Sequence, residues 1–221
     1  MIFNKKIIVS VLEDYIENMF LNKISIVTLG KCDICDYFLK KVNISRLGIK
    51  RIFSSNYTSN FLNYEKNFLF KDSYNFDLFL GSTDSFFDLF FFNFCNGYIL
   101  KEKFFYDNSK HRLLICKNKS FIKNGIYIPV EIIPRQSEYI IGSLSNLGFK
   151  SFLSFNSNGN LFYNVNNLNI LNVFYDFNIN PLLFEKILCS IKGVVSVGIF
   201  INRNTSFFIF NGNKFKLFYI K

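Results

Sequence analysis

Alternating helical and extended patterns in the first half of the sequence restrict its fold more than any other feature. Apolar residues recur at helical spacing over residues 6–20, and the apolar run Ile24–Leu29 then ends at Gly30. A helix is expected over Asp33–Val42, and the next strand, Ile49–Phe53, ends in two serines. Strands that alternate with helices pair in parallel, so this order predicts an α/β fold. In such folds, ligands bind beyond the carboxyl ends of the strands.

The pattern continues with a further strand, helix and strand, and then changes. The strand Phe76–Leu80 is followed by a predicted turn over Gly81–Asp84, the helix Ile99–Tyr106 and the strand Arg112–Cys116. Beyond them, strands, helices and hairpin turns are mixed, which is typical of a small α+β domain. The elements expected there are a β-rich segment at Ile128–Pro134, helices at Ser137–Leu147 and from Pro181, strands at Lys150–Ser157, Leu161–Val165, Ile170–Phe174 and Val194–Phe200, and a hairpin over Ser206–Tyr219.

Composition and charge limit the kinds of partner that we expect. The formal net charge is +10, but the lysines are spread along the chain without a long basic run, so we expect no nucleic-acid partner. The most apolar region, Phe76–Leu100, is interrupted by Asp77, Asp84 and Asp88, which argues against a membrane span. No signal peptide is recognisable, and five irregularly spaced cysteines do not describe a disulfide framework. A reduced, cytoplasmic protein is therefore expected.

Cys32 and Cys35 open the helix after the first predicted strand, and several interpretations compete for them. A CxxC at a helix N-terminus is typical of thioredoxin-like redox sites, although that fold places a proline opposite the pair and the first proline here comes much later. A zinc site needs two more ligands and His111 is the only histidine, so no metal is expected. The simplest interpretation is two ordinary helix-start residues. Gly30, Lys31 and the free N–H groups of the following helix alternatively suit a phosphate group.

Four segments of the second half carry a resemblance to a known family: IPVEIIP at 128–134, NVNNLNILNV at 164–173, NP at 180–181 and GVVSVGIF at 193–200. In order and spacing they resemble the signature segments of type A ribose-5-phosphate isomerases, and the similarity extends over nearly the whole chain. The resemblance implies a Rossmann-like parallel-sheet domain, residues 1–129 with 203–221, that the C-terminal strands complete. It also implies an inserted small α+β domain of ferredoxin-like type over residues 130–202.

The resemblance implies roles for particular residues of this chain. The family's catalytic glutamate falls on Glu102, which would act as the general base, although its local pattern alone is more typical of a solvated helix residue. Gly30 and Asp84 match substrate-binding motifs, and Lys119 corresponds to a lysine that the family has after the next strand. Lys31 is expected to add a positive charge at the phosphate turn.

This chain also departs from the family's motifs. Of the phosphate loop, which falls on residues 30–34, only the glycine is retained; the first aspartate of the acidic motif is Gly81 here, and the motif lysine expected near Asn93 is absent. The activity implied is the interconversion of ribose 5-phosphate and ribulose 5-phosphate by proton transfer through an enediolate, without a cofactor, in a homo-oligomer. The alternative is a catalytically impaired relative that serves as a sugar-phosphate binding or interaction module.

Overall fold

The computed structural model describes most of the chain as two compact units. The first comprises Met1–Ser82, Lys101–Asn118 and Asn202–Lys221, and the second comprises Thr83–Leu100 and Lys119–Ile201. The domain boundaries expected from the sequence stay a prediction, and the one between residues 129 and 130 falls inside a strand. The described residues are 5–20, 24–30, 32–43, 46–54, 75–83, 85–87, 90–92, 98–116, 125–201, 204–211 and 214–220.

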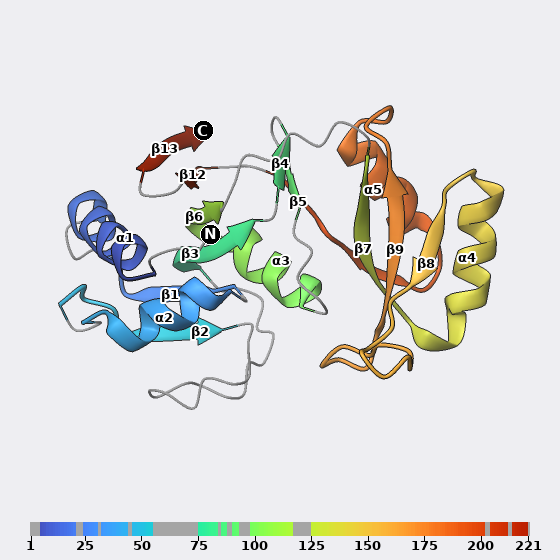
Figure 1. Cartoon of the computed structure of the whole chain (residues 1–221), viewed down its shortest axis with the longest axis horizontal. Helices are drawn as coiled ribbons and strands as arrows, with labels where there is room; N and C mark the ends of the chain where they lie inside the picture. The colour runs from blue at the N-terminus through green and yellow to red at the C-terminus, as the bar shows by residue number, and fades with distance from the viewer. Residues whose placement is uncertain are drawn as a thin grey trace. The chain divides into compact units, whose positions relative to one another are not determined.

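The first unit is built on a six-stranded, mostly parallel sheet (Figure 1). Its strands, in spatial order, are β13 (Lys214–Ile220), β12 (Thr205–Asn211), β6 (Ser109–Cys116), β3 (Phe76–Thr83), β1 (Ile26–Leu29) and β2 (Arg51–Ser54). β1 pairs in parallel with both β2 and β3, β12 pairs in parallel with β6, and β13 runs antiparallel to β12. The expected α/β fold is confirmed, and the C-terminal strands complete the sheet at one edge.

Helices cover both faces of this sheet: α1 (Lys5–Phe20), α2 (Asp33–Lys41) and α3 (Ile99–Asp107), of which the residues from Lys101 onward belong to the first unit. Apolar side chains of α1 and α2 form one core with Leu78 and Leu80 of β3. Phe79 lies between these two leucines and so points to the other face. Its ring packs edge-on against Tyr106 of α3, with ring centroids 5.6 Å apart. α3 therefore covers the face opposite to α1 and α2.

The second unit has the β-α-β-β-α-β order of a ferredoxin-like fold, which confirms the expected α+β architecture. Its elements are β7 (Ile126–Ile132), α4 (Ser137–Asn146), β8 (Ser151–Leu153), β9 (Asn169–Tyr175), α5 (Pro181–Ser190) and β10 (Val194–Val197). The strands form an antiparallel sheet in the order β10-β7-β9-β8. A three-stranded sheet in this unit consists of β4 (Ser85–Phe87), β5 (Phe90–Phe92) and β11 (Ile199–Ile201). None of the described helices is long and apolar enough to cross a membrane.

The structure corrects several of the expected elements, and the strand expected over Lys150–Ser157 is shortened to Ser151–Leu153. β3 continues to Thr83 through the predicted turn, because Gly81 adopts no positive φ and extends the strand. The expected strand Val194–Phe200 is divided between β10 and β11, which belong to different sheets. The expected strand Leu161–Val165 is absent, and only isolated bridges form at Leu161 and Tyr163.

Asparagine side chains explain why the chain between β8 and β9 forms turns. The side-chain oxygen of Asn156 accepts hydrogen bonds from the backbone N–H groups of Asn158 and Asn160. Asn164 binds the N–H groups of residues 166 and 168 in the same way. These short-range bonds use donors that a strand ladder needs, so β8 ends at Leu153 and no strand forms over 161–165.

Candidate active site

The side chain of Glu102, in the first turn of α3, is buried, with 1% of its surface exposed. Its carboxylate faces the ends of two neighbouring strands. A Cβ atom on Gly30, which follows β1, would stand 3.3 Å from Oε1 of Glu102 and 3.3 Å from Cα of Gly81 in β3. The backbone N–H of Gly30 donates a 2.9 Å hydrogen bond to the carbonyl oxygen of Leu80. Glu102, Gly30 and Gly81 therefore meet where β1 and β3 end, at the edge where ligands bind in α/β folds.

Phe79 explains why residues without side chains are needed at this point. A Cβ atom on Gly81 would lie 2.5 Å from Cε1 of Phe79, and one on Gly30 would lie 3.1 Å from Cζ of the same ring. The ring itself is held by Tyr106 of α3. Phe79 thus fills the space that side chains at positions 30 and 81 would need. We did not single out Phe79 from the sequence, because a phenylalanine in an apolar strand carries no local signal of a site.

The N-terminus of α2 adjoins this site through Cys35. Cys32 is the N-cap residue of α2, and its sulfur accepts a 3.1 Å hydrogen bond from the backbone N–H of Cys35. The buried thiol of Cys35 donates to the carbonyl oxygen of Leu80 at 3.4 Å, the same oxygen that accepts from Gly30. Burial raises the pKa of the Cys35 thiol, and the hydrogen bond with Cys32 and the charges of Cys32 and of nearby carboxylates, including Glu102, raise it further. This thiol therefore stays protonated at neutral pH.

The structure describes some of the residues that the sequence places at this site, but not all of them. Gly30 and Glu102 lie together, as stated above. Lys101, which precedes the glutamate, is partly buried, and burial lowers its pKa; its Nζ lies 5.7 Å from the ring centre of Phe105. Within the described ranges, no group of three or more His, Cys, Asp or Glu side chains is placed to hold a metal ion. Three expected residues lie outside the described residues: Lys31, Asp84 and Lys119.

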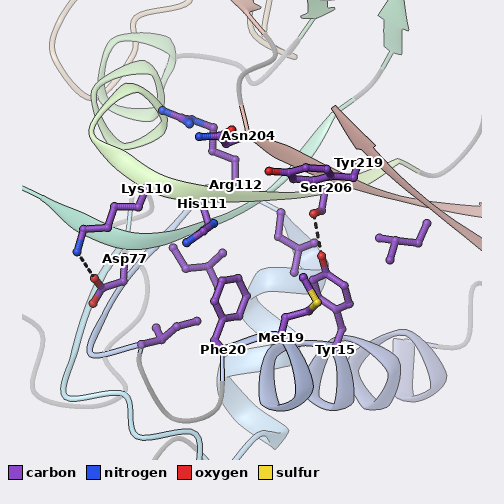
Figure 2. A pocket seen from close by; sticks show the side chains of 14 residues that line it. Tyr15, Met19, Phe20, Asp77, Lys110, His111, Arg112, Asn204, Ser206 and Tyr219 are labelled. Atoms are coloured by element: carbon purple, nitrogen blue, oxygen red, sulfur yellow. Dashed lines mark hydrogen bonds and ion pairs between the residues drawn. The ribbon is translucent and has the colours of Figure 1, made fainter. Parts of the chain in front are cut away.

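A cavity of about 610 Å³ lies at the opposite end of the strands of this sheet, where β3 and β6 begin (Figure 2). Tyr15 and Phe20 of α1 line one side, and Lys110 and His111 of β6 line the other. The ammonium group of Lys110 donates a 2.9 Å hydrogen bond to Asp77. The volume is in the range of small-ligand pockets. The cavity lies at the amino ends of these strands, so it is separate from the glutamate site at the carboxyl ends.

Comparison with known proteins finds relatives that cover the chain. The family model for ribose 5-phosphate isomerase A (phosphoriboisomerase A) matches residues 92–214, more than half of the chain. Ribose 5-phosphate isomerase A from Methanocaldococcus jannaschii is 19% identical, with a TM-score of 0.80 and coverage of 99% of this chain and 100% of that chain.

Two further solved structures give similar values. A D-ribose-5-phosphate isomerase in complex with phospho-erythronic acid is 18% identical, with a TM-score of 0.78 and coverage of 98% of this chain and 97% of that chain. Ribose 5-phosphate isomerase from Plasmodium falciparum is 19% identical, with a TM-score of 0.74 and coverage of 96% and 98%. These proteins share the fold of this chain over almost its full length.

Proposed function

Because this chain belongs to the ribose 5-phosphate isomerase A family, we propose that it interconverts ribose 5-phosphate and ribulose 5-phosphate. The observation that carries the proposal is the buried carboxylate of Glu102 against Gly30 and Gly81. A carboxylate at the carboxyl-end edge of a parallel sheet stands where a ligand binds. This position supports the proposed role of Glu102 as the base for a bound sugar phosphate.

In the proposed mechanism, one proton moves between neighbouring carbon atoms of the open-chain sugar. Glu102 removes the proton from C2 of ribose 5-phosphate, which leaves an enediolate with negative charge on O1. The hydroxyl proton of O2 then moves to O1, and the protonated carboxyl group returns the carbon-bound proton to C1 as the C2 carbonyl forms. In the reverse direction the same group removes the proton from C1. A carboxylate alternates between base and acid in both directions, so the reaction needs no cofactor.

The phosphate group of the substrate is proposed to bind at the N-terminus of α2. Gly30 lies shortly before α2, and the N–H groups of the first turn of that helix carry partial positive charge. Lys31 and Lys119 would add full positive charges, and Asp84 would bind sugar hydroxyl groups. The relative that binds phospho-erythronic acid, a phosphorylated sugar acid, supports this class of substrate.

Position 81 favours a second candidate function, a relative that binds sugar phosphates without turning them over. A Cβ atom there would lie 2.5 Å from Phe79, so the aspartate of the family's motif has no room unless the ring moves. The motif lysine near Asn93 is absent as well, and loss of one donor that stabilises an oxyanion, as a lysine does, typically costs about 10²- to 10³-fold in rate. Enzymes accelerate reactions by at least about 10⁶-fold, so one such loss leaves measurable catalysis. We therefore place the working isomerase first.

The test is a turnover assay with ribose 5-phosphate on the purified wild type and on the variant Glu102→Gln. The matched control is Glu138→Gln, which changes an exposed glutamate of α4. We expect ribulose 5-phosphate from the wild type and the control. Glu102→Gln should lose about 10²- to 10⁴-fold in kcat, the usual contribution of a general base. Thermal stabilisation of the wild type by ribose 5-phosphate without any turnover would instead establish the binding module.

A homo-oligomer and a cytoplasmic location complete the proposal. The edge strand β13 supports self-association, because four of its apolar side chains are exposed: Phe215, Leu217, Phe218 and Tyr219. Sedimentation equilibrium of the purified chain measures the oligomeric state directly, and a monomer at micromolar concentration would contradict this part of the proposal.

A further inference from the structure

Cys32 and Cys35 form a close thiol pair that the proposed isomerase reaction does not use. Their sulfur atoms are 2.7 Å apart. Cys32 is the N-cap of α2 and Cys35 is its third helical residue, whose backbone N–H donates to the sulfur of Cys32. Side chains at these two positions converge at the start of a helix, as they do in a capping box. Local helix geometry therefore brings the two sulfur atoms together.

The two thiols differ in their access to reagents. Cys32 is partly exposed, whereas 1% of the surface of Cys35 is exposed. The thiol of Cys35 lies between the sulfur of Cys32 and the carbonyl oxygen of Leu80. A small disulfide reagent therefore reacts with Cys32 first, and the sulfur of Cys35 is close enough to attack the mixed disulfide that forms on Cys32.

We propose that Cys32 and Cys35 are a redox-active pair that forms a reversible intramolecular disulfide by exchange with a low-molecular-weight disulfide, such as oxidised glutathione. The thiolate of Cys32 attacks one sulfur of the reagent. The reagent's S–S bond breaks, a mixed disulfide forms, and one glutathione leaves, taking up the proton that Cys32 lost.

Cys35 completes the exchange. The Cys35 thiol is protonated in the resting protein, so it must first lose its proton; the resulting thiolate attacks the sulfur of Cys32, the mixed disulfide breaks, and the second glutathione leaves with that proton. The two protein thiols are oxidised by two electrons in total, and the reagent is reduced to two thiols. A dithiol such as dithiothreitol reverses both steps. The exchange does not depend on isomerase activity, so the disulfide experiment and the turnover assay can fail independently of each other.

The experiment follows one tryptic peptide of the full chain. Trypsin cleaves after Lys31 and Lys40, so both cysteines fall in the peptide Cys32–Lys40. The folded protein is equilibrated with mixtures of oxidised and reduced glutathione, and the remaining thiols are blocked with an alkylating reagent. After digestion with trypsin, the mass of the peptide is measured by mass spectrometry. We expect an unalkylated peptide that is lighter by two hydrogen atoms than the dithiol, and dithiothreitol should restore the dithiol.

Two variants and an unfolded sample sharpen the test. In Cys35→Ser, glutathione should accumulate on Cys32 at least about 10-fold over the wild type, because the second thiol is missing. Cys189→Ser, which removes an exposed thiol of α5, should leave the result unchanged. Urea-unfolded protein should form the disulfide at least about 10-fold less readily, because the helix start no longer holds the sulfur atoms together.

Two results would overturn the proposal. One is a wild-type peptide that stays reduced, or that carries glutathione on Cys32 without closing to the disulfide. The other is equal disulfide formation in the folded and unfolded chains, since the folded helix start would then contribute nothing to the pair.

Discussion

Gly30 is the residue at which one added methyl group tests the candidate site most directly. It has no positive φ, so alanine meets no backbone strain there. Its Cβ atom would, however, stand 3.1 Å from Phe79 and 3.3 Å from Oε1 of Glu102. We predict that Gly30→Ala lowers kcat for ribose 5-phosphate about 10-fold or more, because small displacements of a catalytic group cost rate steeply.

The control for this prediction is Gly142→Ala. Gly142 lies in α4, and a Cβ atom there meets nothing within 4 Å. Alanine should leave kcat unchanged and stabilise the fold by about 1 kcal/mol through helix propensity. If both variants keep the wild-type kcat, the proposed role of the Glu102 carboxylate beside Gly30 is wrong.

His111 is the only histidine of the chain, so NMR can follow its titration without ambiguity. Burial lowers its pKa from the ordinary 6.5, the charges of Lys110 and Arg112 lower it further, and Asp77 opposes them. The folded protein thus binds this proton less readily than the unfolded chain. The contribution of His111 to stability is therefore full above the unfolded pKa and is lost as the pH falls through the lower folded pKa.

Lys110→Gln tests this arrangement, because it removes a positive charge beside His111 and the partner of Asp77 (Figure 2). Both changes favour the protonated imidazole, so we predict that the pKa of His111 rises. The chemical shifts of the ring protons, followed against pH, give the measurement. A fall in the pKa would contradict the electrostatics of this cavity.

At the level of elements, the start of α3 is held by Glu131 of β7. Oε1 of Glu131 accepts hydrogen bonds from the backbone N–H of Ile99 (3.1 Å) and from Nδ2 of Asn164 (2.9 Å). Oε2 accepts from the backbone N–H of Leu100 at 2.9 Å. A carboxylate at this position satisfies two N–H groups that have no partner inside the helix. Glu131 is completely buried, so these bonds are protected from water.

We predict that Glu131→Gln lowers the free energy of unfolding by about 1–3 kcal/mol, because an amide offers one acceptor oxygen and turns its NH₂ group toward the other donors. Burial raises the pKa of Glu131 above 4.5, although its three hydrogen bonds oppose this shift. The folded state therefore holds the proton more tightly than the unfolded state. The contribution of Glu131 to the free energy of unfolding is therefore full below the unfolded pKa and is lost as the pH rises through the folded pKa.

Urea titrations at several pH values measure both effects. The stability difference between the wild type and Glu131→Gln should shrink as the pH rises from below 4.5 toward neutrality. Glu138→Gln changes an exposed glutamate of α4 and should alter stability by less than about 0.5 kcal/mol. A difference that grows with pH would contradict the direction of the Glu131 shift.

At the level of the whole molecule, each compact unit has its own apolar core. Leu12 of α1 belongs to the first core and Leu171 of β9 to the second, and both are completely buried. Replacing either by alanine should cost about 2–5 kcal/mol, because the change leaves a cavity. If the units are the independent domains that the sequence predicts, hydrogen exchange should accelerate only in the unit that carries the variant. Equal acceleration in both units would show one cooperative domain.

Much of the fold could be predicted because periodicity records which side of each element faces the core. The helices over residues 5–20, 99–107 and 137–146 are found within a few residues of their expected bounds. Errors arose where side chains compete with the backbone for hydrogen bonds, as at Asn156 and Asn164. The prediction of a turn at Gly81 was also wrong. Glycine is needed there because the ring of Phe79 packs closely against the backbone of a continuing strand.

For the candidate site, the order of patterns along the chain was sufficient to place Gly30 after a strand and Glu102 in the first turn of a helix. The resemblance to the isomerase family supplied the expected role of the glutamate. That its carboxylate is buried against Gly30 could not be predicted, because the contact joins segments far apart in the sequence. The same holds for the shared use of the Leu80 carbonyl by Gly30 and Cys35. Local patterns report how one element faces the core, whereas these contacts arise only when parallel strands bring their ends together.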